Sequence, residues 1–238
     1  MVSASEPESR TATRLRGVML AAITLNLILI GTRVLLYTPF FAQRNALVFL
    51  IEPVVLLLVY AAIVSMITRR PGLQRRVALR TAATVGAITG ALWVVNLAGE
   101  TFTNLNGSIG ILSTAPFFLA AFVLWGVAGF LVARRTGSLG HGILAAVCSA
   151  MLCVLTTITL GFLLLYTSLP HLEHDLLNDP DWLHSGWSDL RAFAIANTFF
   201  AAFTHLLVAV LIGVVVGAIG GGLGMLRKER TSARTTAL

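Results

Sequence analysis

A small set of polar side chains lies within the long apolar stretches of this 238-residue chain. Ionisable groups are costly in hydrocarbon unless they are paired or hydrated, so each is a candidate functional group. A carboxylate there could bind a cation, a proton or a polar substrate group, and an imidazole could carry a proton because it titrates near neutral pH. The candidate substrate-binding residues are Arg33, Glu52, Asn96, Asn197 and His205.

Arg33 and Glu52 are opposite charges on neighbouring stretches. Arg33 lies about one turn from the end of the first stretch, and Glu52 lies six residues into the second. At 1.5 Å per residue these positions are roughly 6 and 9 Å deep, measured from the same side. Two interpretations follow. The residues form a structural ion pair that locks a helical hairpin, or Glu52 binds a ligand beside Pro53, which removes a backbone donor and is expected to bend the helix.

A polar track is expected along the last apolar stretch. Asn197, Ala201 and His205 follow at intervals of four and therefore share one side of a helix. Asn96 lies at a similar depth on another stretch. If these side chains face one another, they line a pocket that opens outward, with Glu52 at its floor. The alternative is that His205 only forms a hydrogen bond to a neighbouring helix.

A weak metal-binding pattern occurs between the last two apolar stretches. His171 and His174 would share a helix face, and with Asp175 they could bind Zn²⁺. Exposed His and Asp are common in such connectors, and no H-E-x-x-H sequence is present. Neither a phosphate-binding G-x-x-x-x-G-K-[ST] loop nor a G-x-S-x-G nucleophile motif occurs. We therefore expect no metal, no cofactor and no catalytic group.

The elements that position these residues are membrane-spanning helices. The chain is 57% hydrophobic and 11% charged, against about 25% charged residues in soluble domains. Runs of about 20 apolar residues are long enough to cross a bilayer as helices. The sequence predicts an all-α fold, a six-helix transmembrane bundle arranged as three consecutive hairpins. The predicted spans are residues 17–37, 46–68, 77–98, 109–133, 142–167 and 192–226.

Basic residues define the expected orientation. Fourteen of the seventeen Lys and Arg lie in the tails and in alternate connectors. Cytoplasmic segments keep such residues, so both termini are predicted to be cytoplasmic, in a cell (plasma or inner) membrane. The same residues would attract anionic lipid headgroups. No aromatic residues are interleaved with them, so nucleic acid is not an expected partner.

The membrane domain is expected to cover residues 17–226, between a disordered cytoplasmic tail over 1–16 and a cytoplasmic tail over 227–238. The connector over residues 168–191 has internal order. Pro170 can begin a short helix, and Asp179-Pro180-Asp181 is typical of a break followed by a new helix cap. Its leucines and tryptophans suit a hairpin lying on the outer surface of the bundle.

Glycines at intervals of four mark expected helix contacts. Such spacing leaves a flat stripe that allows another helix backbone to approach closely. The stripes would serve packing within the bundle, a hinge, or a face for a homo-oligomer or partner membrane subunit. The last span, at 35 residues, would be on the order of 50 Å long against a hydrocarbon core near 30 Å, so it must tilt, protrude or break. The glycine pairs are Gly86/Gly90, Gly213/Gly217 and Gly220/Gly224.

Three classes of function are compatible with these observations. The favoured hypothesis is a transport or permease-type component with a polar site in the outer half of the bundle. The first alternative is a non-catalytic scaffold or accessory subunit, in which polar groups only hold helices together. The second is a membrane-embedded enzyme that uses His and Glu.

Overall fold

The computed structural model of the chain describes residues 6–69, 72–103 and 108–236. These residues form helices and no strand, which confirms the predicted all-α class. In chain order the elements are α1 (Glu6–Leu36), the 3-10 helix η1 (Thr38–Ala42), α2 (Ala46–Thr68), α3 (Leu73–Thr103), α4 (Ser108–Thr136), α5 (Leu139–Thr167), α6 (Leu169–Leu176), α7 (Pro180–His184) and α8 (Leu190–Thr236).

Six helices in the described part of the chain are long and apolar enough to cross a membrane. Their outer surfaces are apolar as well: Leu35 and Met66 are each 75% exposed, and many other large apolar side chains are exposed. A continuous apolar surface of this kind suits lipid and not water. The protein is therefore an integral, multi-pass membrane protein. The spans are Ala12–Leu36, Ala46–Thr68, Leu73–Gly99, Thr114–Thr136, Leu139–Thr167 and Leu190–Arg227.

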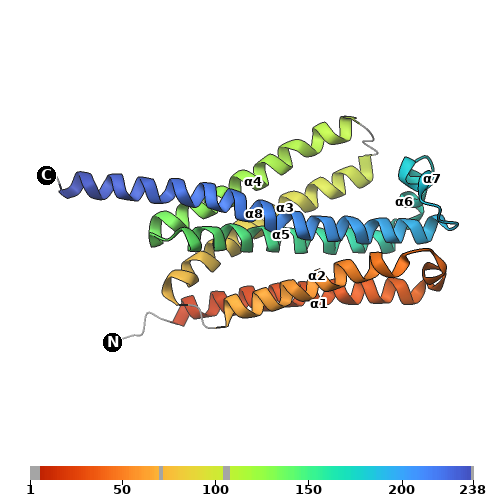
Figure 1. Ribbon diagram of the computed structural model, residues 1–238, viewed down its shortest axis with the longest axis horizontal. Coiled ribbons are helices and arrows are strands. Elements are labelled where there is room, and N and C mark those ends of the chain that lie inside the picture. The colour runs from red at the N-terminus through yellow and green to blue at the C-terminus, as the bar shows by residue number, and fades with distance from the viewer. Residues whose placement is uncertain (1–5, 70–71, 104–107, 237–238) are drawn as a thin grey trace.

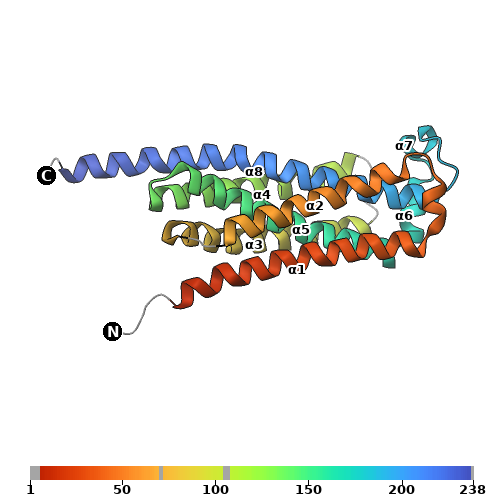
Figure 2. The ribbon, with the colours of Figure 1, turned by 60° about the horizontal axis from the view of Figure 1, so that its bottom comes forward.

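The long helices lie side by side, and the start of α1 and the end of α8 lie at the same end of the bundle (Figures 1 and 2). We call this end, where α2 and α4 also finish, the basic end, because Arg69, Arg75, Arg134 and Arg135 lie there. The short helices α6 and α7 lie at the other end, which we call the capped end (Figure 1).

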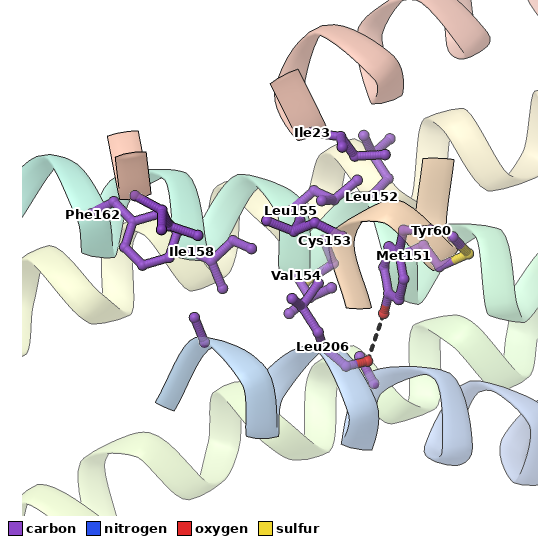
Figure 3. Packing of buried hydrophobic residues seen from close by; sticks show 14 of the residues in the cluster. Ile23, Tyr60, Met151, Leu152, Cys153, Val154, Leu155, Ile158, Phe162 and Leu206 are labelled. Carbon is purple, nitrogen blue, oxygen red and sulfur yellow. Dashed lines mark hydrogen bonds between the residues drawn. The ribbon is translucent and has the colours of Figure 1, made fainter. Parts of the chain in front are cut away.

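Helix α5 is the centre of the bundle. Its most apolar segment is 67% buried within the protein, whereas the other five spans are 22–33% buried. Small residues such as Ala145, Ala146 and Ser149 line α5, and α3 and α8 make their most extensive contacts with it. Larger α5 side chains then pack against α1, α2 and α8, and Tyr60 and Leu206 lie beside them in Figure 3. Helix α5 thus contacts helices of all three hairpins, and α8 also joins α4 and α2 directly.

All six predicted packing glycines lie at helix contacts within the chain. On α3, an added Cβ at Gly86 would lie 2.9 Å from the Ser149 carbonyl oxygen of α5, and Gly90 lies against Thr156. The α8 glycines divide between two partners. Gly213 and Gly217 lie against α5, whereas Gly220 and Gly224 lie against the α4 backbone. These contacts support packing within the bundle.

The long last span, which was expected to tilt, protrude or break, protrudes as part of helix α8. This helix continues unbroken for 47 residues, roughly 70 Å at 1.5 Å per residue, and protrudes beyond the basic end (Figures 1 and 2). The prediction of a disordered tail over residues 1–16 is wrong for residues 6–16, which extend α1 as helix. This extension contains two Glu and three Arg, and both residue types favour helix.

The connector over residues 168–191 contains two short helices, α6 and α7, that begin near the proline and aspartate positions singled out in the sequence. Pro170 lies in the first turn of α6, and the Asp179 side chain caps α7 by accepting a 2.7 Å hydrogen bond from the Asp181 amide. Trp187 packs edge-on against Phe40 and Phe49. These ring contacts fix the connector onto the capped end.

Replacing Gly220 with alanine is expected to destabilise the bundle, because the new methyl group would overlap the Gly126 carbonyl group of α4. Overpacking of this kind costs about 1–3 kcal/mol. Gly222→Ala is the matched control, since no atom lies within 4 Å of its added Cβ. Thermal unfolding in detergent should show a lower Tm for Gly220→Ala and an unchanged or slightly higher Tm for Gly222→Ala. Equal Tm values for the two variants would contradict the assigned packing.

Candidate functional site

Arg33 and Glu52 do not form an ion pair. The Arg33 guanidinium lies over the Tyr166 ring of α5, 5.4 Å from its centroid, and its buried Nε has no hydrogen-bond partner. The Tyr166 hydroxyl donates to the Leu29 carbonyl oxygen at 2.7 Å, which holds the ring against α1. Arg33 therefore joins α1 to α5 and not to α2.

Glu52 is half-buried on α2, and it makes no hydrogen bond or ion pair with any described residue. Its neighbour Pro53 is buried, whereas Ile51 and Val55 are exposed on the apolar outer surface. The carboxyl group therefore lies at the border between the bundle core and the lipid-facing side. A charge in this setting is costly, and no described residue offsets that cost through an ion pair or a hydrogen bond.

The two asparagines lie in different environments. Asn96 of α3 is buried, 5% exposed, whereas Asn197 of α8 is exposed. The structure thus separates the predicted residues among α1, α2, α3 and α8 and does not gather all five around one pocket.

His205 is exposed on the outer side of α8, where it lines a small, half-open hollow with four aromatic rings, and we call this feature the aromatic cavity. Its volume is about 50 Å³, and it lies between α3, α4, α5 and α8. The His205 ring meets Trp93 edge-on at 6.4 Å, and Trp93 meets Phe118 at 4.5 Å. The aromatic lining comes from α3 and α4: Trp93, Phe118, Phe122 and Trp125.

Hydrogen bonds fix the polar groups around the aromatic cavity. His205 Nδ1 lies 2.7 Å from the Ala201 carbonyl oxygen, which can only accept, so Nδ1 carries a proton. In the neutral ring, Nε2 is then a free acceptor. The Trp125 indole donates to Thr89 Oγ1 at 3.3 Å, and Thr157 donates to its own helix backbone at 3.0 Å. One imidazole nitrogen is thus the strongest acceptor presented by these side chains.

The size of the aromatic cavity limits what it can hold. Pockets for drug-sized ligands measure about 300–1,000 Å³, whereas one water needs about 10–15 Å³ of such volume. A 50 Å³ space suits a few waters, a small cation or a small apolar group. Aromatic faces attract cations, and an imidazole can accept a proton.

The weak metal candidates lie together on α6 but do not form a metal centre. His171 Nε2 lies 3.6 Å and His174 Nδ1 lies 3.8 Å from the Asp175 carboxylate oxygens. In the described residues, no group of three or more His, Cys, Asp or Glu side chains is arranged to hold a metal ion.

Two polar contacts at the capped end were not anticipated from the sequence. Arg191 and Glu173 form an ion pair that joins α8 to α6, and the Tyr37 hydroxyl donates to Asp189 Oδ2 at 2.6 Å. The Asp189 carboxylate also accepts from the Ala192 amide at 3.0 Å and so caps α8. Opposite charges within the 168–191 connector were the available signal for the ion pair, but they do not specify which residues pair.

Burial and the hydrogen bond between Tyr37 and Asp189 shift the pKa of both residues. Burial, and then the hydrogen bond to Asp189, raises the pKa of Tyr37 to about 12. Burial alone would raise the pKa of Asp189, but the hydrogen bonds from Tyr37 and from the α8 amides outweigh it and lower that pKa. The carboxylate form of Asp189 is therefore the form that stabilises the capped end.

Polar groups inside the bundle also join helices. The Asn26 amide of α1 donates to Thr159 Oγ1 at 3.0 Å and to the Leu155 carbonyl oxygen of α5. The Tyr60 hydroxyl of α2 donates to the Leu206 carbonyl oxygen of α8 at 2.6 Å (Figure 3). Asn26 could have been found in the sequence as an amide in the middle of an apolar stretch.

Asp189→Ala should lower the free energy of unfolding by about 1–2 kcal/mol, the usual cost of losing a helix cap. The pKa of Asp189 is lowered in the folded state, so its stabilisation is present above the ordinary Asp pKa near 4 and is lost as the pH falls below that value. The Tm of the wild type, measured from pH 7 down to pH 3, should fall more steeply than that of Asp189→Ala. Asp179→Ala, which uncaps only α7, is the control. Parallel pH profiles for wild type and Asp189→Ala would contradict the role of this carboxylate.

Comparison with known proteins does not assign this chain to a family. No protein-family model, no curated protein and no solved structure matches this chain.

Proposed function

We propose that the protein is a proton-transferring transport component of a cell membrane, with its site in the aromatic cavity. The observation that carries the proposal is the position of His205, an imidazole on the exposed side of a membrane-spanning helix, with one free acceptor nitrogen and a water-sized, half-open hollow beside it. Intramembrane ionisable groups beside cavities mark ion and proton pathways.

The proposed orientation has the basic end in the cytoplasm. The described arginines are concentrated at that end, whereas Glu173, Asp175, Asp179, Asp181 and Asp189 lie at the capped end. Under the positive-inside rule both termini are then cytoplasmic and the capped end faces outward. The aromatic cavity would lie near the middle of the bundle, because its lining extends from Trp93 and Phe118 in the capped-end halves of α3 and α4 to Trp125 and Ile212 near the centres of α4 and α8.

Glu52 is the second proposed transport residue. It is a half-buried carboxyl group with no partner among the described residues, so protonation or cation binding would relieve its cost in lipid. Asn96, Asn197 and Arg33 do not line the aromatic cavity, and we propose for them only a supporting role nearer the capped end, with Arg33 held by Tyr166.

A second candidate function is a membrane scaffold. Hydrogen bonds such as Tyr60 to Leu206 and Asn26 to Thr159 join helices, as expected for polar groups that only hold a bundle together. Under this alternative, the unpaired Glu52 at the lipid-facing border would dock a partner membrane subunit or a second copy of the chain.

Proton flux distinguishes the two candidates. Purified protein in liposomes that contain the pH dye pyranine should acidify the lumen when a potassium diffusion potential, negative inside, is applied. His205→Ala should lose most of this flux, because the proton-accepting nitrogen is removed. His184→Ala, which changes an exposed histidine of α7, is the control and should keep the flux. If liposomes with the wild-type protein acidify no faster than protein-free liposomes, the transport proposal is contradicted and the scaffold is favoured.

Glu52→Leu gives an independent prediction, in which the protein becomes more stable while its proton flux falls. No ion pair or hydrogen bond with the described residues is lost, and a carboxyl group is removed from an apolar surface, so the free energy of unfolding should rise by about 1–3 kcal/mol. Flux in the same liposome assay should fall. Thermal unfolding in detergent and the flux assay test the two halves separately. A lower Tm would show that Glu52 has a structural partner, and an unchanged flux would remove it from the pathway.

A further inference from the structure

A second hollow lies at the basic end of the bundle, between the start of α3 and the end of α4. We call it the basic groove. Its volume is about 740 Å³, well above that of the aromatic cavity and within the range of small-molecule sites. The side chains that matter for its chemistry are Arg76, Arg80, Thr84, Val85, Leu131 and Arg135.

Positive charge is concentrated on the rim of this groove. Arg76 and Arg80 lie one turn apart on α3, and Arg135 lies in the last turn of α4. No acidic residue lines the groove, and neither Arg80 nor Arg135 pairs with any described carboxylate. The start of α3 adds the partial positive charge of a helix N-terminus. Guanidinium groups in this arrangement match the oxygens of a phosphate, which they can bind bidentately.

The deeper wall of the groove is apolar apart from Thr81 and Thr84, whose hydroxyls donate to carbonyl oxygens of α3 itself. Val85 lies nine residues beyond Arg76 on α3, roughly 14 Å further from the basic end, and Leu131 lies one turn before Arg135 on α4. The lining thus changes from guanidinium to hydrocarbon along the direction in which a membrane changes from headgroup to acyl chain. A free phosphate ion would use only the rim, whereas an anionic lipid would use both parts.

We propose that the basic groove is a binding site for the phosphate-bearing headgroup of an anionic membrane lipid. The phosphate lies among Arg76, Arg80 and Arg135, and the first acyl carbons lie along Val85 and Leu131. This site is distinct from the aromatic cavity and does not depend on the transport proposal. It differs from a general attraction of basic residues to anionic membranes, because specific guanidiniums and an apolar wall define it.

The test is lipid binding by the full-length protein in detergent, measured by native mass spectrometry. The probes are phosphatidylglycerol, phosphatidylcholine with the same acyl chains, sn-glycerol 3-phosphate and inorganic phosphate. The proposal predicts that phosphatidylglycerol binds at least about tenfold more tightly than each of the other three. Equal binding of inorganic phosphate and phosphatidylglycerol would make this a free-phosphate site and overturn the lipid assignment.

A matched pair of double variants separates a defined site from diffuse surface charge. Arg80→Gln with Arg135→Gln removes two groove guanidiniums, and it should weaken phosphatidylglycerol binding by about tenfold or more. Arg75→Gln with Arg134→Gln removes the same charge from neighbouring exposed positions that do not line the groove, and binding should remain within about twofold. An equal loss in both double variants would overturn the proposal. Thermal unfolding of each variant verifies that the bundle is intact.

Discussion

Close approach of helix backbones to α5 is the constraint on which the rest of the structure depends. Lipid tails are as apolar as leucine, so helices in a membrane gain little from hiding apolar surface and must gain from contact and hydrogen bonding. Small residues on α5 accept Gly86 of α3 and Gly217 of α8 at near-contact distance. The position of α8 determined in this way also places His205 beside the rings of α3 and α4. Packing and the candidate site are therefore consequences of the same contacts.

The surrounding lipid also explains where polar groups lie in the described bundle, because lipid tails offer them no hydrogen bonds. In the interior, amides and hydroxyls such as Asn26 and Tyr60 donate to backbone or side-chain oxygens of neighbouring helices, which satisfies donors that lipid cannot. At the capped end, ion pairs and ring contacts fix the connector, and at the basic end arginines surround a groove. Ligands can bind only where this packing leaves space, and the aromatic cavity and the basic groove are two such places.

The sequence predicted the helices well and their faces poorly, and both results have physical reasons. Long apolar runs that end at arginine, proline or glycine define where a helix can lie in a bilayer, and each predicted span agrees with a helix of the structure. The partner of Arg33 could not be predicted, because it depends on the rotation of α1 and α5 about their axes. Tyr166 meets Arg33, whereas Glu52 is turned toward the lipid-facing border of α2. The aromatic cavity was missed for the same reason, since its rings belong to α3 and α4 and its imidazole belongs to α8.

The central claim is that these helices cross a bilayer with the basic end and the capped end on opposite sides. Single cysteines at Gly72→Cys and Asn178→Cys test it directly, because both positions are exposed and the native Cys148 and Cys153 are buried. Intact cells expressing each variant would be treated with a membrane-impermeant maleimide. Labelling of Asn178→Cys on intact cells, and of Gly72→Cys only after permeabilisation, is the predicted result. Labelling of both positions on intact cells would contradict the proposed membrane arrangement.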